Sequence, residues 1–345
     1  MGRLYKFIDE FGFYIFILFS TFVISILGSF IPFKVDLKPY YTRLVMLEQI
    51  LEDKVAHFPS PDLISRPVWY LFAFIFVIIF LSAVVIFLYL IFNFLSRKRV
   101  MAGSNFRPCP LWNMKDFFKI FIWILFWIEV ISVFQDFMGM VFVYNFRTYL
   151  INSLCGSLMV DLLTIFLLIY WLRRHYHQKI TAVGISLSST VQDFKRAVFY
   201  YLGFLPVLFL LIYAGIFIAH RIQKPSPPQP LFYFLLFEND RLILTLVIIF
   251  VVIIGPIAEE LFFRGLFYNA LKKSIGVSQA MLVSSILFAV LHMNIFGFLP
   301  IFGLALLFVF MYERTASLKV PIFLHMLHNG FLVAMIVFVR IFIQS

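Results

Sequence analysis

Two adjacent glutamates, with an arginine one helical turn further on, lie inside a strongly apolar part of this chain. The run from Leu242 to Ile254 is almost wholly aliphatic and leads directly to Glu259, Glu260 and Arg264. Ionisable groups at bilayer depth are costly, so they occur mainly where they face a protein interior or a water-filled cavity. The paired carboxylates are therefore the first candidates for chemistry.

The composition indicates an integral membrane protein. Hydrophobic residues make up 63% of the 345 residues, only 13% are charged, and the mean hydropathy is +1.00. A soluble protein of this size cannot hide so much apolar surface. The apolar runs are long enough to cross a bilayer as helices, whereas a β-barrel would show short alternating segments. We therefore predict an all-α, polytopic transmembrane helical bundle.

Hydropathy predicts about nine spans, of which the last four carry the polar motifs described below. They are residues 11–33, 68–95, 117–143, 149–172, 198–219, 242–270, 279–293, 296–312 and 318–343.

Three features organise the chain around these spans. An amphipathic stretch, Thr42 to His57, is expected on the outer surface. Residues 220–241 are rich in proline and are expected to lack regular structure. Lysine and arginine cluster in alternate loops, at Arg97–Arg99, Arg173–Arg174 and Lys272–Lys273 among others, which predicts a cytoplasmic N-terminus.

The net charge of +11 does not indicate a nucleic-acid partner. The basic residues cluster at the ends of apolar segments, where they set membrane topology, and we expect no nucleic acid to bind. Cys109 and Cys155 lie far apart and support neither a disulfide framework nor a cysteine metal site.

The two glutamates are expected to play different parts. Glu260 and Arg264 stand at i,i+4 on one helix face, where pairing lowers the cost of burying both charges. Glu259 is rotated by about 100° from Glu260 and is left to face something else. The alternative is a buried ion network with no reactive role.

Histidines in two later spans supply possible partners. His292 ends the apolar sequence that begins at Phe288, and His325 and Asn329 share a helix face at i,i+4. His328 can lean towards the same side. With a rise of about 1.5 Å per residue, these groups and Glu259 fall at similar depths, so they can meet in one cavity.

In this order, the three motifs resemble those of the CPBP family, which comprises CAAX prenyl proteases and bacteriocin-processing (Abi) proteins. The motifs are Glu-Glu-x-x-x-Arg, Phe-x-x-x-His and His-x-x-x-Asn, present as Glu259-Glu260-Arg264, Phe288-His292 and His325-Asn329. The resemblance covers residues 200–343. It divides the chain into a protease core at 198–345 and an N-terminal transmembrane region of unknown role at 1–197.

The resemblance implies an intramembrane endopeptidase in which Glu259 and His292 activate water. His325 and Asn329 would orient or stabilise the oxyanion, a role that an amide donor suits. Glu260 and Arg264 would be the supporting pair.

The implied substrate is a membrane-associated peptide or a prenylated, CAAX-type protein. The implied location is a bacterial plasma membrane, with the chain as a multi-pass protein in contact with the lipid bilayer.

A metal is an open question at this stage. Glu259, His292 and His325 could hold a divalent ion such as zinc and leave a position for water. The chain lacks the His-Glu-x-x-His spacing of the usual zinc helix. We favour water activation without an obligatory metal, with a divalent ion as the alternative.

Two other functions are considered. A proton-coupled transporter would use Glu259, Asp161 and the histidines as a relay, but inverted repeats are not evident. A non-catalytic membrane scaffold or immunity protein would use the fold only to bind a partner. Asp161, with Glu129 and Asp136, is expected to make hydrogen bonds between helices.

Overall fold

The fold was analysed in a computed structural model, which describes residues 2–29, 42, 46, 49–50, 67–95, 112–141, 146–186, 188–222 and 230–344. These residues contain helices and no strand, which confirms the all-α prediction. Most of the predicted amphipathic stretch Thr42 to His57, and the basic loop Arg97–Arg99, lie outside the described residues.

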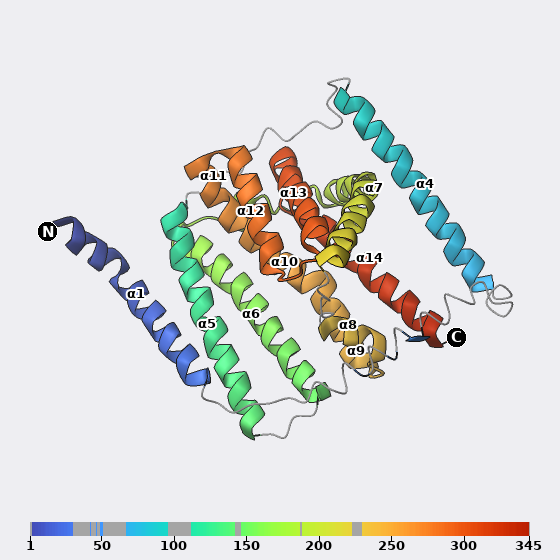
Figure 1. The fold of residues 1–345 in the computed structure, drawn as a ribbon. Helices are drawn as coiled ribbons and strands as arrows, with labels where there is room; N and C mark the ends of the chain where they lie inside the picture. Colours follow the sequence, from blue (N-terminus) through green and yellow to red (C-terminus); the bar gives the residue numbers. More distant parts are fainter. Residues whose placement is uncertain are drawn as a thin grey trace.

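Each of the nine predicted spans corresponds to a helical segment (Figure 1). Seven described helices are long and apolar enough to cross a membrane, and two further apolar stretches, Gly12–Ile26 and Val277–Leu291, are shorter. The helices outside the sixth span are α1 (Gly2–Ser29), α4 (Pro67–Leu95), α5 (Met114–Val141), α6 (Phe146–Arg174), α7 (Thr190–Ile222), α12 (Val277–Leu291), α13 (Phe298–Thr315) and α14 (Lys319–Gln344).

The sixth span is one long helix, Arg241–Ile275, that changes its winding twice. Its segments are α9 (Arg241–Ile249), the π-helix η2 (Phe250–Ile254), α10 (Gly255–Glu260), the π-helix η3 (Leu261–Tyr268) and α11 (Asn269–Ile275). Single π-helical turns are rare and often mark functional sites. Here they flank the short α10 segment that carries both glutamates.

The helices are arranged around this long helix. Helices α1, α5 and α6 lie side by side on one flank, and α5 and α6 pack against η3 (Figure 1). On the other side, α7 packs against α13 and α14, and α4 packs on α7. The sixth span is therefore packed on both sides, and Glu260, Arg264 and Asn269 within it are buried.

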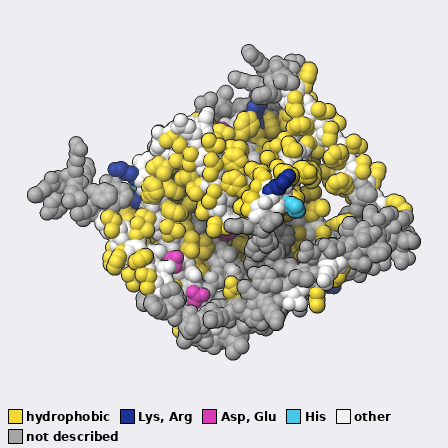
Figure 2. Space-filling view, viewed as in Figure 1, with side chains coloured by type: hydrophobic (Ala, Val, Ile, Leu, Met, Phe, Trp, Pro, Cys, Tyr) yellow, Lys and Arg dark blue, Asp and Glu magenta, His cyan; other side chains and the backbone are white. Residues whose placement is uncertain are grey.

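The outside of the bundle is apolar. Figure 2 shows hydrophobic side chains over most of the visible described surface, with few charged groups between them. On α4, Phe74 is 63% and Val85 is 66% exposed. Such a surface suits contact with lipid tails, where exposed apolar side chains carry no penalty.

The expectation of an irregular loop at 220–241 is wrong for its second half, because α8 (Pro230–Phe237) is helical. Proline is tolerated in the first turn of a helix, where its missing N–H would have no partner in any case. Pro230 therefore begins the helix. Asp240 then caps the N-terminus of α9 by accepting hydrogen bonds from the backbone N–H groups of Leu242 and Ile243.

A polar junction holds the turn between α8 and α9. Arg147 at the start of α6 donates to Glu238, with Nε 2.8 Å from Oε2. The backbone N–H groups of Asn239 and Asp240 also donate to Glu238. From α14, Arg340 donates to the carbonyl oxygens of Leu235 and Glu238. The junction ties α6, α8, α9 and α14 together at one end of the bundle.

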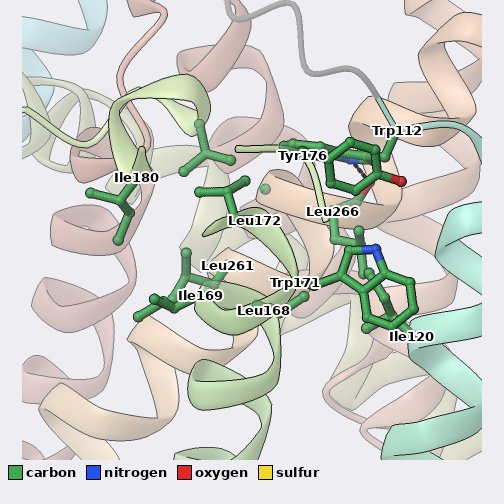
Figure 3. Close-up of a pocket in the computed structure, with 12 residues that line it drawn as sticks. Trp112, Ile120, Leu168, Ile169, Trp171, Leu172, Tyr176, Ile180, Leu261 and Leu266 are labelled. Atoms are coloured by element: carbon green, nitrogen blue, oxygen red, sulfur yellow. Dashed lines mark hydrogen bonds between the residues drawn. The ribbon is translucent and has the colours of Figure 1, made fainter. Parts of the chain in front are cut away.

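A small apolar cavity lies between α6, η3 and the 3₁₀ turn η1 (Ile180–Val183) (Figure 3). Its volume is about 30 Å³, and Trp112, Leu172 and Leu261 are among its lining residues. This space holds at most a water molecule, and the lining offers almost no polar partner for one. It is a packing gap.

The polar junction makes stability depend on pH. The hydrogen bond from Arg147 lowers the pKa of Glu238 below the usual value of a glutamate, and the two backbone N–H groups act in the same direction. A carboxylate with a lowered folded-state pKa stabilises the fold above its unfolded pKa, and this contribution is lost as the pH falls through the folded pKa. We expect the melting temperature in detergent to decrease as the pH is lowered from about 5. The decrease should be smaller in Glu238→Gln.

Arg147→Met should also reduce the decrease in melting temperature at acidic pH, because it removes the main cause of the lowered pKa of Glu238. The double variant should show no further reduction beyond that of Glu238→Gln alone. An equal decrease in melting temperature at acidic pH in wild type and in Glu238→Gln would contradict this account.

Candidate active site

The site is a cavity of about 800 Å³ enclosed by helices from both halves of the chain. Glu259 on α10, His292 just after α12, and His325 and Asn329 on α14 all line it. The four residues that sequence analysis selected as catalytic are thus brought together from three separate parts of the chain. A mainly apolar cavity with a few convergent polar groups is the usual form of a binding or active site.

Next to this cavity, Glu260 and Arg264 form a fully buried ion pair. Arg264 Nη1 lies 2.7 Å from Glu260 Oε1, and the side chains are 1% and 0% exposed. The predicted i,i+4 pair is therefore present. Removing one partner from a buried pair leaves an uncompensated charge, at a cost of about 3–5 kcal/mol.

Aromatic rings enclose the arginine. The guanidinium carbon lies 4.6 Å from the ring centroid of Phe288 and 5.3 Å from that of Phe308. Arg264 Nη2 also donates to the carbonyl oxygen of Ala305 on α13. Cation–π contacts strengthen when they are removed from water. The arginine thus joins η3 to α12 and α13 and fixes the position of Glu260.

His325 is held between Glu260 and Glu259. Its Nδ1 lies 3.1 Å from Glu260 Oε1, and its ring stacks on Phe308 at a centroid distance of 5.2 Å. Its Nε2 then points to Glu259 Oε2 at 3.9 Å. This separation is too long for a direct hydrogen bond, but a water molecule can bridge it. The pair of Arg264 and Glu260 therefore also orients His325.

His292 takes its orientation from its own helix. Its Nδ1 lies 2.7 Å from the carbonyl oxygen of Phe288, which can only accept, so Nδ1 carries the proton and donates. In the neutral ring, the lone pair is then on Nε2. The spacing Phe-x-x-x-His has a double use, because the Phe288 ring also packs against the His292 ring at 4.7 Å.

One detail of the expected helix is wrong here. We expected His292 inside a span reaching residue 293, whereas α12 ends at Leu291 and His292 is its C-cap. Met293 has φ 50°, the left-handed conformation that commonly ends a helix. His292 therefore lies at the helix terminus.

The winding of the sixth span explains how Asn329 is held. Its side-chain nitrogen donates to the carbonyl oxygen of Val251 at 2.8 Å. In η2, the N–H of Gly255 donates to the carbonyl of Phe250, five residues back. In that register the donor to Val251 would be residue 256, which is proline and has no N–H. Pro256 thus leaves an acceptor open for Asn329.

Glu259 differs from Glu260 as its rotation on the helix predicts. Its side chain is 36% exposed, and its Oε2 has no hydrogen-bond partner among the described residues. It faces the cavity and lies away from Arg264, which pairs with Glu260. A carboxylate without a protein partner, beside two histidines, is suited to act on a water molecule.

Glu259, His292 and His325 are the residues that the sequence offered as possible metal ligands. No three His, Cys, Asp or Glu side chains within the described part of the chain are grouped to hold a metal ion. In this arrangement Glu259, His292 and His325 do not form such a group. The Nδ1 of His325 is bound to Glu260, and its Nε2 faces Glu259.

Some cavity residues were not assigned to the site from the sequence. Asp161 on α6 lines the cavity, and so does His328, whose Nδ1 lies 3.3 Å from the Tyr201 hydroxyl. The ring of Phe308, which stacks on His325, was also missed. Single polar residues in apolar helices were the only available signal for the first two, and nothing distinguishes Phe308 among 48 phenylalanines.

Comparison with known proteins supports the motifs. The family model for type II CAAX prenyl endopeptidases, Rce1-like, matches residues 241–331. "Membrane-embedded CAAX protease MroQ" of Staphylococcus aureus (strain USA300) is 45% identical over 93 residues, 25% of this chain and 37% of that protein. "Putative membrane peptidase YdiL" of Bacillus subtilis (strain 168) is 38% identical over 104 residues, 28% of this chain and 43% of that protein. No solved structure matches the chain significantly.

The matches thus span less than half the length of these two relatives, and they fall where the motifs lie. The segment 241–331 holds the three motifs with their spacing, and its side chains line one cavity between transmembrane helices. Over this segment the chain is similar to the Rce1-like type II CAAX prenyl endopeptidases, in agreement with the CPBP resemblance of its motifs.

Proposed function

We propose that this protein is an intramembrane endopeptidase that hydrolyses a peptide bond of a membrane-associated or prenylated, CAAX-type substrate. One observation carries the proposal: Glu259, His292, His325 and Asn329, from three parts of the chain, line one cavity within the helical bundle. The printed name of the Staphylococcus aureus relative, which describes a CAAX protease, supports the substrate class.

In the proposed first step, Glu259 accepts a proton from a water molecule as the water oxygen attacks the scissile carbonyl carbon. His292 accepts a hydrogen bond from the same water through its Nε2, since its Nδ1 is bound to the Phe288 carbonyl. General-base catalysis by a positioned side chain contributes about 10²–10⁴-fold. His325, held by Glu260, lies on the other side of the carboxylate, with its Nε2 3.9 Å from Glu259 Oε2.

The second step breaks the carbon–nitrogen bond of the tetrahedral intermediate. Asn329 uses only one of its two amide N–H groups on Val251, and the other is available to the oxyanion. Such a donor is effective in a site shielded from water. Glu259 returns its proton to the leaving amine, so the products are a carboxylic acid and an amine, and the enzyme is unchanged.

Replacement of the proposed base gives the first test. Glu259→Gln keeps the size and polarity of the side chain but removes its basicity, so kcat should fall about 10²–10⁴-fold. The measurement is cleavage of a labelled CAAX-type peptide panel by purified protein in detergent, with the melting temperature as a check of folding.

Glu313→Gln is a matched control. Glu313 pairs with Lys272 away from the cavity, so its loss should leave kcat near the wild-type value. Equal cleavage by wild type and Glu259→Gln would disprove the role of the carboxylate. No cleavage of any peptide by folded wild type would count against the peptidase function itself.

Metal dependence gives a second test. Because the proposed steps use side chains alone, activity should survive a strong chelator and subsequent desalting. Elemental analysis of the active protein should show no stoichiometric zinc. Loss of activity on chelation, restored by added zinc, would show that a metal has a catalytic role and would replace this mechanism.

A further inference from the structure

The wall of the cavity opposite the three motifs is polar and comes from outside the segment that matches the family. Helices α5 and α6 contribute Ser132, Gln135, Ser153, Ser157 and Asp161 to the lining. The three from α6 are four residues apart, so they share one helix face. That face packs towards α10 and η2 (Figure 1). A stripe of polar side chains at bilayer depth thus faces the proposed catalytic groups.

Asp161 is the charged member of this wall. The expectation that it makes a hydrogen bond between helices is wrong: within the described part of the chain it has no hydrogen bond or ion pair, although it is half-buried. Glu259 lines the same cavity, so the two carboxylates face a common space. An ionisable residue in a membrane is retained mainly where it has a partner or a task.

The distance between the two carboxylates follows from the helix between them. A methyl group added at Gly255 would lie 3.7 Å from Asp161 Oδ2, so Asp161 packs against the backbone there. Gly255 precedes Glu259 by four residues in the α-helical segment α10, on the same face. One helical turn is about 5.4 Å of rise, so Asp161 approaches the helix about one turn from the proposed base.

Apart from its three histidines, the ionisable groups that line the cavity are carboxylates. Its lining includes Asp161 and Glu259, and no lysine or arginine from the described residues. Arg264 neutralises Glu260 and lies outside the lining. A cavity inside an apolar helical bundle that holds two carboxylates and no lysine or arginine attracts a positively charged ligand, because Coulomb interactions strengthen as the dielectric constant falls.

We propose that Asp161 is a specificity-determining residue that binds a cationic group of the substrate, within two residues of the scissile bond. The proposal rests on the peptidase function above. In an extended peptide, residues two apart present side chains on the same side, about 6.6 Å from each other. This spacing is close to one helical turn. A peptide whose scissile carbonyl meets Glu259 would therefore bring a lysine or arginine side chain, or a free amino terminus, to Asp161.

The test compares matched peptides on the full-length protein in detergent. One series carries lysine at each position within two residues of the cleaved bond, and the other carries norleucine, which has a similar chain without the charge. Wild type should prefer the best lysine peptide by about 10-fold or more in kcat/KM, as expected for a charge-assisted contact in a desolvated site. Amino-terminal acetylation of each peptide distinguishes a side-chain ammonium from a terminal one.

Asp161→Asn should lower kcat/KM for the preferred cationic peptide to the level of its uncharged counterpart, while cleavage of the norleucine peptides changes little. Asp161→Lys should reverse the preference in favour of glutamate peptides. Asp136→Asn is the matched control: Asp136 is a carboxylate on the neighbouring α5 but does not line the cavity. That variant should keep the wild-type preference.

The outcomes separate the two proposals. An unchanged preference in Asp161→Asn, or an equal loss on lysine and norleucine peptides, overturns the role of Asp161 and leaves the peptidase function intact. No preference for any cationic peptide by active wild type also overturns it. No cleavage of either series by folded wild type counts against the peptidase function. If Asp161→Asn fails to fold, Asp161→Ser, which also removes the carboxylate, replaces it, provided that its melting temperature is near that of wild type.

Discussion

The buried ion pair between Glu260 and Arg264 is the interaction on which the site depends. Neither charge has access to water, so each is tolerated only because the other lies 2.7 Å away. The pair reaches further through its other contacts: Arg264 binds the carbonyl of Ala305 and lies against Phe288, and Glu260 holds His325. One desolvated pair thus fixes three later helices against the sixth span.

Irregular winding of the sixth span provides the second constraint. In an uninterrupted α-helix every interior carbonyl already accepts one hydrogen bond within the helix. The π-helix η2, followed by Pro256, leaves the carbonyl of Val251 open, and Asn329 occupies it. The helix gives up one backbone hydrogen bond and gains a contact that positions a side chain in the cavity. The π-helix η2 thus helps to position Asn329.

The two halves of the chain contribute differently to the cavity. The segment 241–331 supplies Glu259, the histidines and Asn329, and it is the part that matches the family model. Helices α5 and α6 close the opposite wall and supply Asp161. The match to the family model falls in the segment with the motifs and does not extend to α5 and α6. This arrangement is consistent with chemistry carried by the motifs and selectivity carried by the wall.

The sequence alone determined the fold class and the candidate residues. Long apolar runs predict helices because only internally hydrogen-bonded segments can cross a bilayer, and all nine were found. Ionisable residues within such runs stand out because their burial is costly, which singled out Glu259 and His292. The i,i+4 spacing of Glu260 and Arg264 also predicted their pairing, since both lie on one helix.

Tertiary structure decided everything that depends on contacts between helices. The helical period places a side chain on a face but does not say which neighbour that face meets, so Glu260 binding His325 and Asp161 approaching Gly255 could not be predicted. The π-helical winding and the end of α12 before His292 were likewise not predicted from the sequence. The sequence shows which ionisable residues are costly to bury, because they lie within apolar runs. Which residue pairs with each of them depends on how the helices pack.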